Sequence, residues 1–255
     1  MTRRCALLLL LAAGSARALD RDVAPPESGL TVSSPAMLAA GRQSASAQLV
    51  VWGNYPVLSA GFAEGLPGRV EVTARGLFDH RKVVGFGEWR AFDFDEFEGA
   101  ARWSPPTDLP AGGLTASAAG FSRMYTRQKY SDGRYSFWAL RFWWAEALAR
   151  AGTATGPRVT LGTRWLRTVE ARTDTGALLL AAETPPVGGL SLLADSAWFL
   201  ANPLRWGRPW AAGFKAAVGA HALTLYASNT WGPMTVDSLD GTSITFWNVR
   251  VTLGM

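Results

Sequence analysis

Apolar and polar residues alternate with a period of two over residues 245–255, the last eleven of the chain. Only an extended strand places alternate residues on opposite faces, so the pattern predicts a β-strand with one apolar side. One face would carry Trp247, Val249, Val251, Leu253 and Met255, and the other Phe246, Asn248, Arg250, Thr252 and Gly254. A closed barrel pairs its last strand with its first and so leaves no open edge. We therefore expect this stretch to be a closing strand, paired with residues 43–53.

The same period of two recurs along the rest of the chain, with little helical periodicity. It predicts strands at residues 43–53, 57–65, 69–78, 93–104, 114–126, 134–149, 158–168, 176–184, 189–200, 209–219, 222–230 and 243–255. In residues 134–149 we expect Trp138, Leu140, Phe142 and Trp144 on one apolar face, opposite Arg141 and Trp143. An even number of strands, about 12, is typical of bacterial single-chain barrels. The predicted fold is an all-β, transmembrane, antiparallel up-and-down β-barrel over residues 43–255.

The connections between these strands alternate in length. Those predicted on the periplasmic side are mostly tight and rich in Gly and Pro, at residues 66–68, 105–113, 150–157, 185–188 and 220–221. The opposite side carries the longer connections, at residues 79–92, 201–208 and 231–242. This asymmetry is typical of outer-membrane barrels, and a soluble β-sandwich has no reason to produce it.

The start of the chain has the features of an export signal. Arg3 and Arg4 precede a short apolar run, and small residues surround Ala18. We expect residues 1–18 to be a signal peptide that is removed after Ala18. Residues 19–42 would then form a periplasmic N-terminal segment, either loose or folded back into the lumen as a plug. The predicted location is the outer membrane of a Gram-negative bacterium.

Composition supports an exported barrel. The formal net charge of +5 falls to about +2 once Arg3, Arg4 and Arg17 are removed, and the basic residues are scattered, so we expect no nucleic-acid partner. Cys5 is the single cysteine and lies in the predicted signal peptide, which excludes disulfides and thiol chemistry in the mature chain. The chain has 12 tryptophans, of which we assign to interfacial girdles Trp52, Trp103, Trp138, Trp144, Trp165, Trp198, Trp210 and Trp247.

Several segments carry a family resemblance. They are SPAMLAAG at residues 34–41, EGLPGRVEV at 64–72, HALTLYASNT at 221–230 and the terminal strand. In the order of these segments, the chain resembles a loose group of small, largely uncharacterised proteobacterial outer-membrane β-barrels, including the porin-like YjbH-type barrels linked to exopolysaccharide. Residues 247–255 resemble the C-terminal signal read by the outer-membrane assembly machinery, with Met255 in place of the terminal aromatic residue. The resemblance implies a fold, a location and an assembly partner, and no catalytic motif.

The polar faces of the predicted strands are the candidate lumen lining. They carry Arg69, Glu71, Arg75, Glu98, Arg102, Arg123, Arg141, Arg164, Glu183, Asp195, Lys215, Asn248 and Arg250. The basic residues outnumber the acidic ones, which favours passage or binding of an anionic solute or polysaccharide. The alternative is that these charges pair across a narrow lumen and fill it.

The sequence argues against an enzyme. The mature chain has only His80 and His221, which the predicted topology places at opposite ends of the barrel. Asp79, Asp93 and Asp95 offer at most a weak cation site, and a solvated acidic loop touching lipopolysaccharide is the alternative. Phosphate-loop, zinc and other cofactor motifs are absent, so we expect no cofactor. The predicted function is a small porin-like channel or an accessory of envelope or polysaccharide export, embedded in outer-membrane lipid and lipopolysaccharide. The alternative is a structural or binding barrel with a closed lumen.

Overall fold

The computed structural model describes residues 30, 37–52, 55–79, 96–104, 114–129, 135–152, 156–169, 172–201, 208–230 and 241–255. At residues 52, 55–56, 78–79, 96, 114–129, 135–141 and 241–244 it describes the backbone but not the side chains. The predicted signal peptide, most of residues 19–42 and the long connections at 80–92 and 231–240 lie outside these residues.

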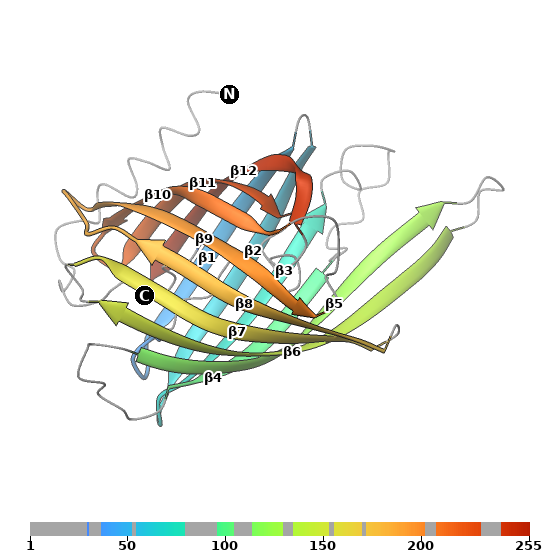
Figure 1. Cartoon of the computed structure of the whole chain (residues 1–255), viewed down its shortest axis with the longest axis horizontal. Helices are drawn as coiled ribbons and strands as arrows, with labels where there is room; N and C mark the ends of the chain where they lie inside the picture. Colours follow the sequence, from blue (N-terminus) through green and yellow to red (C-terminus); the bar gives the residue numbers. More distant parts are fainter. Residues whose placement is uncertain are drawn as a thin grey trace.

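The described part of the chain folds into one closed antiparallel barrel (Figure 1). Its strands are β1 (Gln43–Trp52), β2 (Tyr55–Leu66), β3 (Val70–Asp79), β4 (Glu96–Trp103), β5 (Leu114–Lys129), β6 (Tyr135–Gly152), β7 (Arg158–Thr168), β8 (Thr173–Glu183), β9 (Leu190–Ala201), β10 (Trp210–Val218), β11 (His221–Thr230) and β12 (Gly241–Gly254). Each strand pairs with its neighbours in sequence, and β12 pairs with β1. The all-β, up-and-down prediction is confirmed, as is the number of strands within the described residues.

The closing pair is the one that the sequence predicts. Along it Gln48 faces Arg250 and Val50 faces Asn248, and the register continues down to Ser44 opposite Gly254. The Met255 amide donates to the Gln43 carbonyl at 2.8 Å, and the Gln43 amide donates back to Met255 at 3.1 Å. The last residue is therefore held by the first strand, and the sheet has no open edge between β1 and β12.

The barrel wall has an apolar outer face and a mixed inner face. In β12 the exposed side chains are Trp247, Val249, Val251 and Leu253, and the buried ones are Phe246, Asn248, Arg250 and Thr252. Other strands whose side chains are described repeat this alternation, with exposed Leu58, Phe62, Leu161, Leu192, Phe214 and Leu225. A single wall of strands has only these two sides, so the buried set points into the barrel. Among the described residues, no helix is long and apolar enough to cross a membrane.

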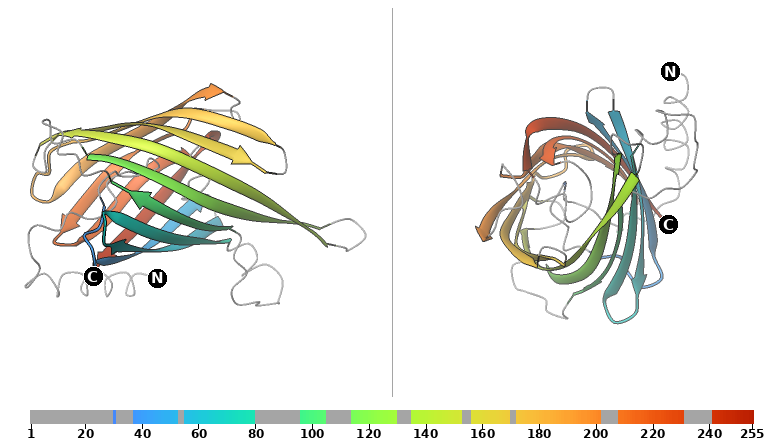
Figure 2. Two further views of the ribbon diagram at one scale, coloured as in Figure 1. Left: turned by 90° about the horizontal axis from the view of Figure 1, so that it is seen from below. Right: turned by 90° about the vertical axis from the view of Figure 1, so that its right-hand side faces the viewer.

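The predicted faces of β6 are wrong. Phe142 and Trp144 are only 5% and 4% exposed and point inward, whereas Trp143 is 53% exposed and points outward. Trp144 therefore leaves the predicted outer girdle, while Trp103, Trp165, Trp210 and Trp247 stay exposed. The reason is that this strand has bulky apolar residues on both sides, so a period of two cannot tell which side is inside. β6 is also 18 residues long, and with β5 it extends past the rest of the barrel (Figures 1 and 2).

Apolar side chains fill part of the interior. One buried cluster combines Val50, Val57, Leu77 and Phe246 of β1, β2, β3 and β12 with residues of β6 to β9. The residues that β6 to β9 contribute to this cluster form a second group, namely Phe142, Trp144, Leu148, Leu166, Ala177, Leu179 and Ala197. In the strand order these two groups lie on opposite sides of the closed barrel. The interior is thus apolar in one region and charged in another, and the charged region is where chemistry can occur.

Candidate functional site: the charged inner wall

The core of the charged region is a row of side chains that follows the hydrogen-bonding direction across five strands. Glu71 of β3 is the register partner of Arg102 on β4, and Arg102 is the partner of Ala118 on β5. Ala118 is in turn the partner of Glu146 on β6, and Glu146 faces Arg164 on β7. Residues opposite one another in neighbouring strands share a face of the sheet. We call Glu71, Arg102, Glu146 and Arg164 the charge row.

Opposite charges in this row are paired. Arg102 Nη1 donates to Glu71 Oε1 at 2.9 Å. Arg164 donates to Glu146 Oε2 through both Nε, at 3.0 Å, and Nη2, at 2.6 Å. All four side chains are buried. Because desolvation of two charges offsets most of their attraction, such pairs add little net stability, but removal of one partner is costly.

A second group of charges surrounds Glu183 of β8. Arg158 of β7 lies 3.3 Å from Glu183 Oε2, and Lys215 of β10 forms an ion pair with Oε1. Arg150 of β6 lies within electrostatic reach of both Glu183 and Arg102. Two basic side chains therefore pair with one carboxylate, and Arg150 adds a third positive charge nearby, which gives this part of the inner wall a local excess of positive charge.

Uncharged polar groups line the wall on β1, β11 and β12. The Gln48 amide nitrogen donates to the Tyr226 hydroxyl at 2.7 Å and to the Asn248 side-chain oxygen at 3.1 Å. The Asn248 amide nitrogen donates to Ser228 Oγ at 3.1 Å. The Arg250 guanidinium lies 5.5 Å from the centre of the Tyr226 ring. This connected network fixes the side chains next to the closing strand pair.

The same part of the wall holds a piece of the N-terminal segment. The Leu30 amide donates to Asp195 Oδ2 at 2.9 Å, and Arg250 Nη2 donates to the Leu30 carbonyl at 3.1 Å. Leu30 itself packs with Leu193, Ala211 and Tyr226. Side chains from β9 and β12 thus clamp the backbone of Leu30 inside the barrel.

A second contact of this segment lies on β2 and β3. The Leu38 amide donates to Glu71 Oε2 at 2.8 Å, so the charge row also binds backbone. A Cβ atom at Gly65 would collide with the carbonyl oxygens of Leu38 and Ala39, so only glycine allows this close approach. Leu30 and Leu38 of the predicted N-terminal segment therefore lie against the inner wall.

Most predicted lumen residues fall on the inner side of the wall. Buried ones are Glu71, Glu98, Arg102, Arg164, Glu183, Asp195, Lys215, Asn248 and Arg250, and Arg75 is half-buried near Glu98. Arg69 is a correction: it is exposed in the turn between β2 and β3, with φ at 59°, and does not line the interior. Arg141 and Arg123 are register partners on β6 and β5, at positions whose side chains are not described.

Sequence reasoning missed Glu146 and Arg150. Both share the inward face of β6 with Phe142 and Trp144, as the alternation of burial shows. A signal was available, because charged residues at the middle of a membrane barrel strand avoid the lipid side. Giving Glu146 and Arg150 priority over the tryptophans would have oriented the strand correctly.

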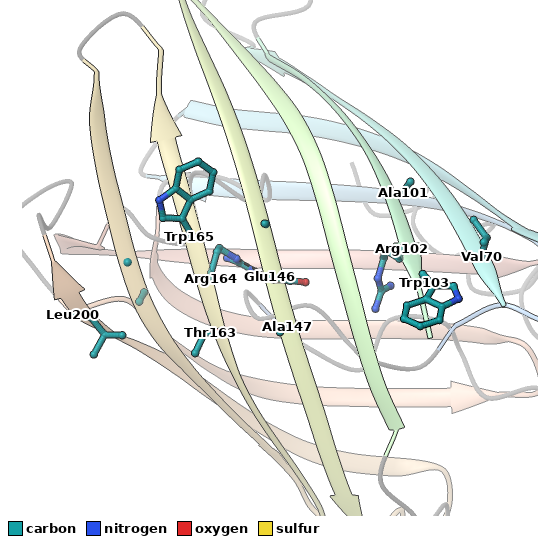
Figure 3. Close-up of a pocket in the computed structure, with 13 residues that line it drawn as sticks. Val70, Ala101, Arg102, Trp103, Glu146, Ala147, Thr163, Arg164, Trp165 and Leu200 are labelled. Carbon is teal, nitrogen blue, oxygen red and sulfur yellow. Dashed lines mark hydrogen bonds and ion pairs between the residues drawn. The ribbon is translucent and has the colours of Figure 1, made fainter. Parts of the chain in front are cut away.

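The outer face carries a hollow of its own. It has a volume of about 930 Å³ and is bordered by Trp103 and Trp165, with Ala101, Ala145 and Ala147 between them. In Figure 3, Trp165 and Arg164 point to different sides of β7, and Arg164 lies beside Glu146. The hollow therefore opens on the apolar outer surface, and Arg102, Glu146 and Arg164 of the charge row also border it.

No group of three or more potential metal ligands occurs among the described residues. His221 is the first residue of β11. His80, Asp93 and Asp95 lie outside the described residues, as does the side chain of Asp79, so the weak cation site proposed from the sequence falls there.

Comparison with known proteins yields structural neighbours only. No protein-family model and no curated protein sequence matches the chain. A solved KdgM porin in complex with disordered oligogalacturonate has 8% sequence identity and a TM-score of 0.53, covering 83% of this chain and 97% of the porin. A second KdgM porin structure has 8% sequence identity and a TM-score of 0.52, covering 82% of this chain and 97% of that porin. Salmonella typhi OmpF in complex with daunomycin has 9% sequence identity and a TM-score of 0.37, covering 84% of this chain and 96% of OmpF. At these identities the KdgM match shows that the chain has the fold of a porin barrel.

Proposed function

We propose that this protein is an outer-membrane, porin-like channel for small anionic solutes. The observation that carries the proposal is the charge row with the group around Glu183, buried on the inner wall of a closed barrel. A barrel that only had to be filled would gain more from apolar side chains, because buried ion pairs are poor stabilisers. Charges kept inside are instead useful where water and ions enter.

Support for the membrane location comes from the outer face. Exposed large apolar side chains occur on most strands, among them Phe97, Leu161, Leu178, Phe214 and Trp247. Contiguous apolar surface of this extent is unfavourable in water and suited to hydrocarbon. The porin fold shared with the KdgM structures agrees with this location. A barrel of this kind is made by Gram-negative bacteria, and a signal peptide would deliver it.

Support for anions comes from the charge balance of the inner wall. Among the described inward-facing side chains seven are basic, namely Arg75, Arg102, Arg150, Arg158, Arg164, Lys215 and Arg250, and five are acidic, namely Glu71, Glu98, Glu146, Glu183 and Asp195. Rings of basic side chains favour anion permeation. A KdgM porin neighbour was solved with oligogalacturonate, an anionic sugar chain, so a short acidic saccharide belongs to the proposed class of solutes.

A second candidate is the closed structural or binding barrel. It is favoured by the apolar cluster that joins opposite sides of the interior and by the clamp on Leu30. In that case the clamped segment and the apolar cluster together would block ion flow. A role as an accessory of polysaccharide export is compatible with either candidate.

Swelling of proteoliposomes tests the proposed solute class. Vesicles containing the folded protein should swell faster in isotonic sodium gluconate than in isotonic N-methylglucamine chloride, whose organic ion is of similar size but cationic. Heat-modifiable migration on gels shows that the barrel is folded before each assay. Equal swelling rates in the two solutes would contradict anion preference, and no swelling in either would favour the closed barrel.

A further inference from the structure

Within the β4–β6 part of the inner wall, three polar side chains have buried atoms with no hydrogen-bond partner among the described residues. They are Arg102, at Nε and Nη2, Glu146, at Oε1, and Trp144, at Nε1. Trp144 and Glu146 are successive inward residues of β6, and Arg102 is two strands away in the same register row. Buried polar groups are nearly always paired, so several in one place call for an explanation.

The unpartnered edge of Arg102 has a defined shape. Its Nη1 is engaged by Glu71, which fixes the orientation of the guanidinium plane. The Nε–H bond and one Nη2–H bond lie in that plane, point in the same direction and form a two-donor fork. Such a fork matches the two oxygens of a carboxylate, which is the reason arginine is favoured for binding carboxylates.

Glu146 offers a hydrogen-bond acceptor on the other side of a gap from the Arg102 donors. Arg164 engages its Oε2 twice and leaves Oε1 as an acceptor. Between Arg102 and Glu146 the register position on β5 is Ala118, so the two backbones are about 10 Å apart at the usual strand spacing. In Figure 3, the Arg102 and Glu146 side chains lie on either side of the β5 ribbon.

The surrounding charge favours an anion at the fork. Glu71 and Arg102 neutralise each other, as do Glu146 and Arg164. Arg150 is close enough for its charge to act on Arg102, and it adds positive charge beside the row. A carboxylate at the fork would therefore meet a favourable field, while Glu146, already neutralised, can still accept a hydrogen bond.

We propose that Arg102, Trp144 and Glu146 form a binding site for a hydroxycarboxylate, a small solute with one carboxylate and neighbouring hydroxyl groups, such as a sugar acid. The carboxylate accepts hydrogen bonds from the Arg102 fork. A hydroxyl group donates to Glu146 Oε1, and a hydroxyl oxygen accepts from Trp144 Nε1. A neutral sugar lacks the group for Arg102, and a simple carboxylate lacks the groups for Glu146. The inference deepens the proposed channel function, because it names a solute class and its resting place on the inner wall.

Binding to the full mature chain, folded in detergent micelles, tests the site without requiring transport. The probes are sodium glucuronate, sodium acetate and glucose, titrated by isothermal calorimetry. Loss of a hydrogen bond to a charged group costs enough to weaken binding about tenfold. We therefore expect glucuronate to bind at least about tenfold more tightly than acetate or glucose. Equal affinities for glucuronate and acetate, or no glucuronate binding, would overturn the proposal.

Variants assign any binding to these residues. Arg102→Gln removes the fork and should weaken glucuronate binding about tenfold or more. The matched control is Arg167→Gln, which alters an exposed arginine on the outer face of β7 and should change affinity less than twofold, about the scatter between equivalent surface changes. If Arg102→Gln does not fold, Arg102→Lys decides, since it keeps a positive charge beside Glu71 but removes the two-donor fork. Unchanged affinity in whichever variant folds would contradict the site.

Different results would contradict the hydroxycarboxylate site and the channel function. A folded protein that conducts ions but does not bind glucuronate overturns the site and leaves the channel intact. A protein that binds glucuronate with the expected dependence on Arg102, but conducts no ions, overturns the channel and identifies a binding barrel.

Discussion

At the scale of single residues, the Glu146–Arg164 pair shows why the inner wall is fragile. Both side chains are about 1% exposed, and one carboxylate oxygen accepts both hydrogen bonds from the arginine. In such a place neither charge can be hydrated if its partner is removed. Removal of one partner should therefore cost more stability than replacement of both partners together.

Arg164→Met should destabilise the barrel by about 3 to 5 kcal/mol, because it leaves Glu146 buried without its counter-charge. The double variant Glu146→Gln/Arg164→Met should recover most of that loss. Urea unfolding in lipid vesicles, followed by tryptophan fluorescence, measures both. Arg167→Met is the control, since Arg167 and Asp174 are exposed and their pair should contribute less than about 1 kcal/mol. A double variant as unstable as the single one would show that packing, and not charge, dominates.

Lys215 is the inner-wall residue best suited to a selectivity test. Lys215→Gln removes one positive charge, and Glu183 keeps Arg158 as its partner. The reversal potential in a tenfold salt gradient should move toward zero, because fewer fixed cations favour anions less. Arg167→Gln, on the outer face, should leave the reversal potential unchanged. The same shift in both variants would place the selectivity outside the inner wall.

At the scale of strands, the closing pair β1–β12 depends on the apolar outer face of β12. Val249 lies near the middle of the register between the two strands and is exposed. Val249→Arg should cost about 2 to 4 kcal/mol if that face is in hydrocarbon. Unfolding in lipid vesicles measures this cost, with Val187→Arg in the exposed turn before β9 as the control. Equal stability of the two variants would contradict a membrane position for β12.

The N-terminal segment depends on one glycine of β2. Gly65→Val should displace residues 37–42 from the wall, because the added atoms occupy the place of the Leu38 and Ala39 carbonyl groups. Trypsin should then cleave after Arg42 faster than in the natural protein. Gly99→Ala is the matched control, since a Cβ there meets only the edge of Phe97. No change in the cleavage rate would show that the segment is held elsewhere.

The sequence predicts some strands well and others poorly, for physical reasons. In β12 the two faces differ sharply in polarity, so both its pairing with β1 and the inward set could be predicted. In β6 large apolar residues occupy both faces, and burial inside a barrel resembles burial in lipid. Arg69 failed because a basic residue at a strand end and one in a turn look alike in the sequence. Pairing partners such as Glu146 with Arg164 depend on register between strands, which a single-chain pattern does not contain.

At the scale of the whole molecule, the interior contains two opposed features. The charge row and the group around Glu183 suit water and anions, whereas the apolar cluster and the clamped Leu30 restrict the space. The proposed channel requires that a continuous aqueous path run past the apolar cluster. That path is the central claim, and it concerns the barrel as a whole.

Single-channel recording in planar lipid bilayers tests this claim most directly. Full-length mature protein that shows heat-modifiable migration is added to one side, and the current is recorded at fixed voltage in potassium chloride. The proposed function predicts discrete, stepwise current increases and a reversal potential that favours chloride in a salt gradient. Correctly folded protein that inserts but gives no current steps would contradict the channel and establish a closed barrel.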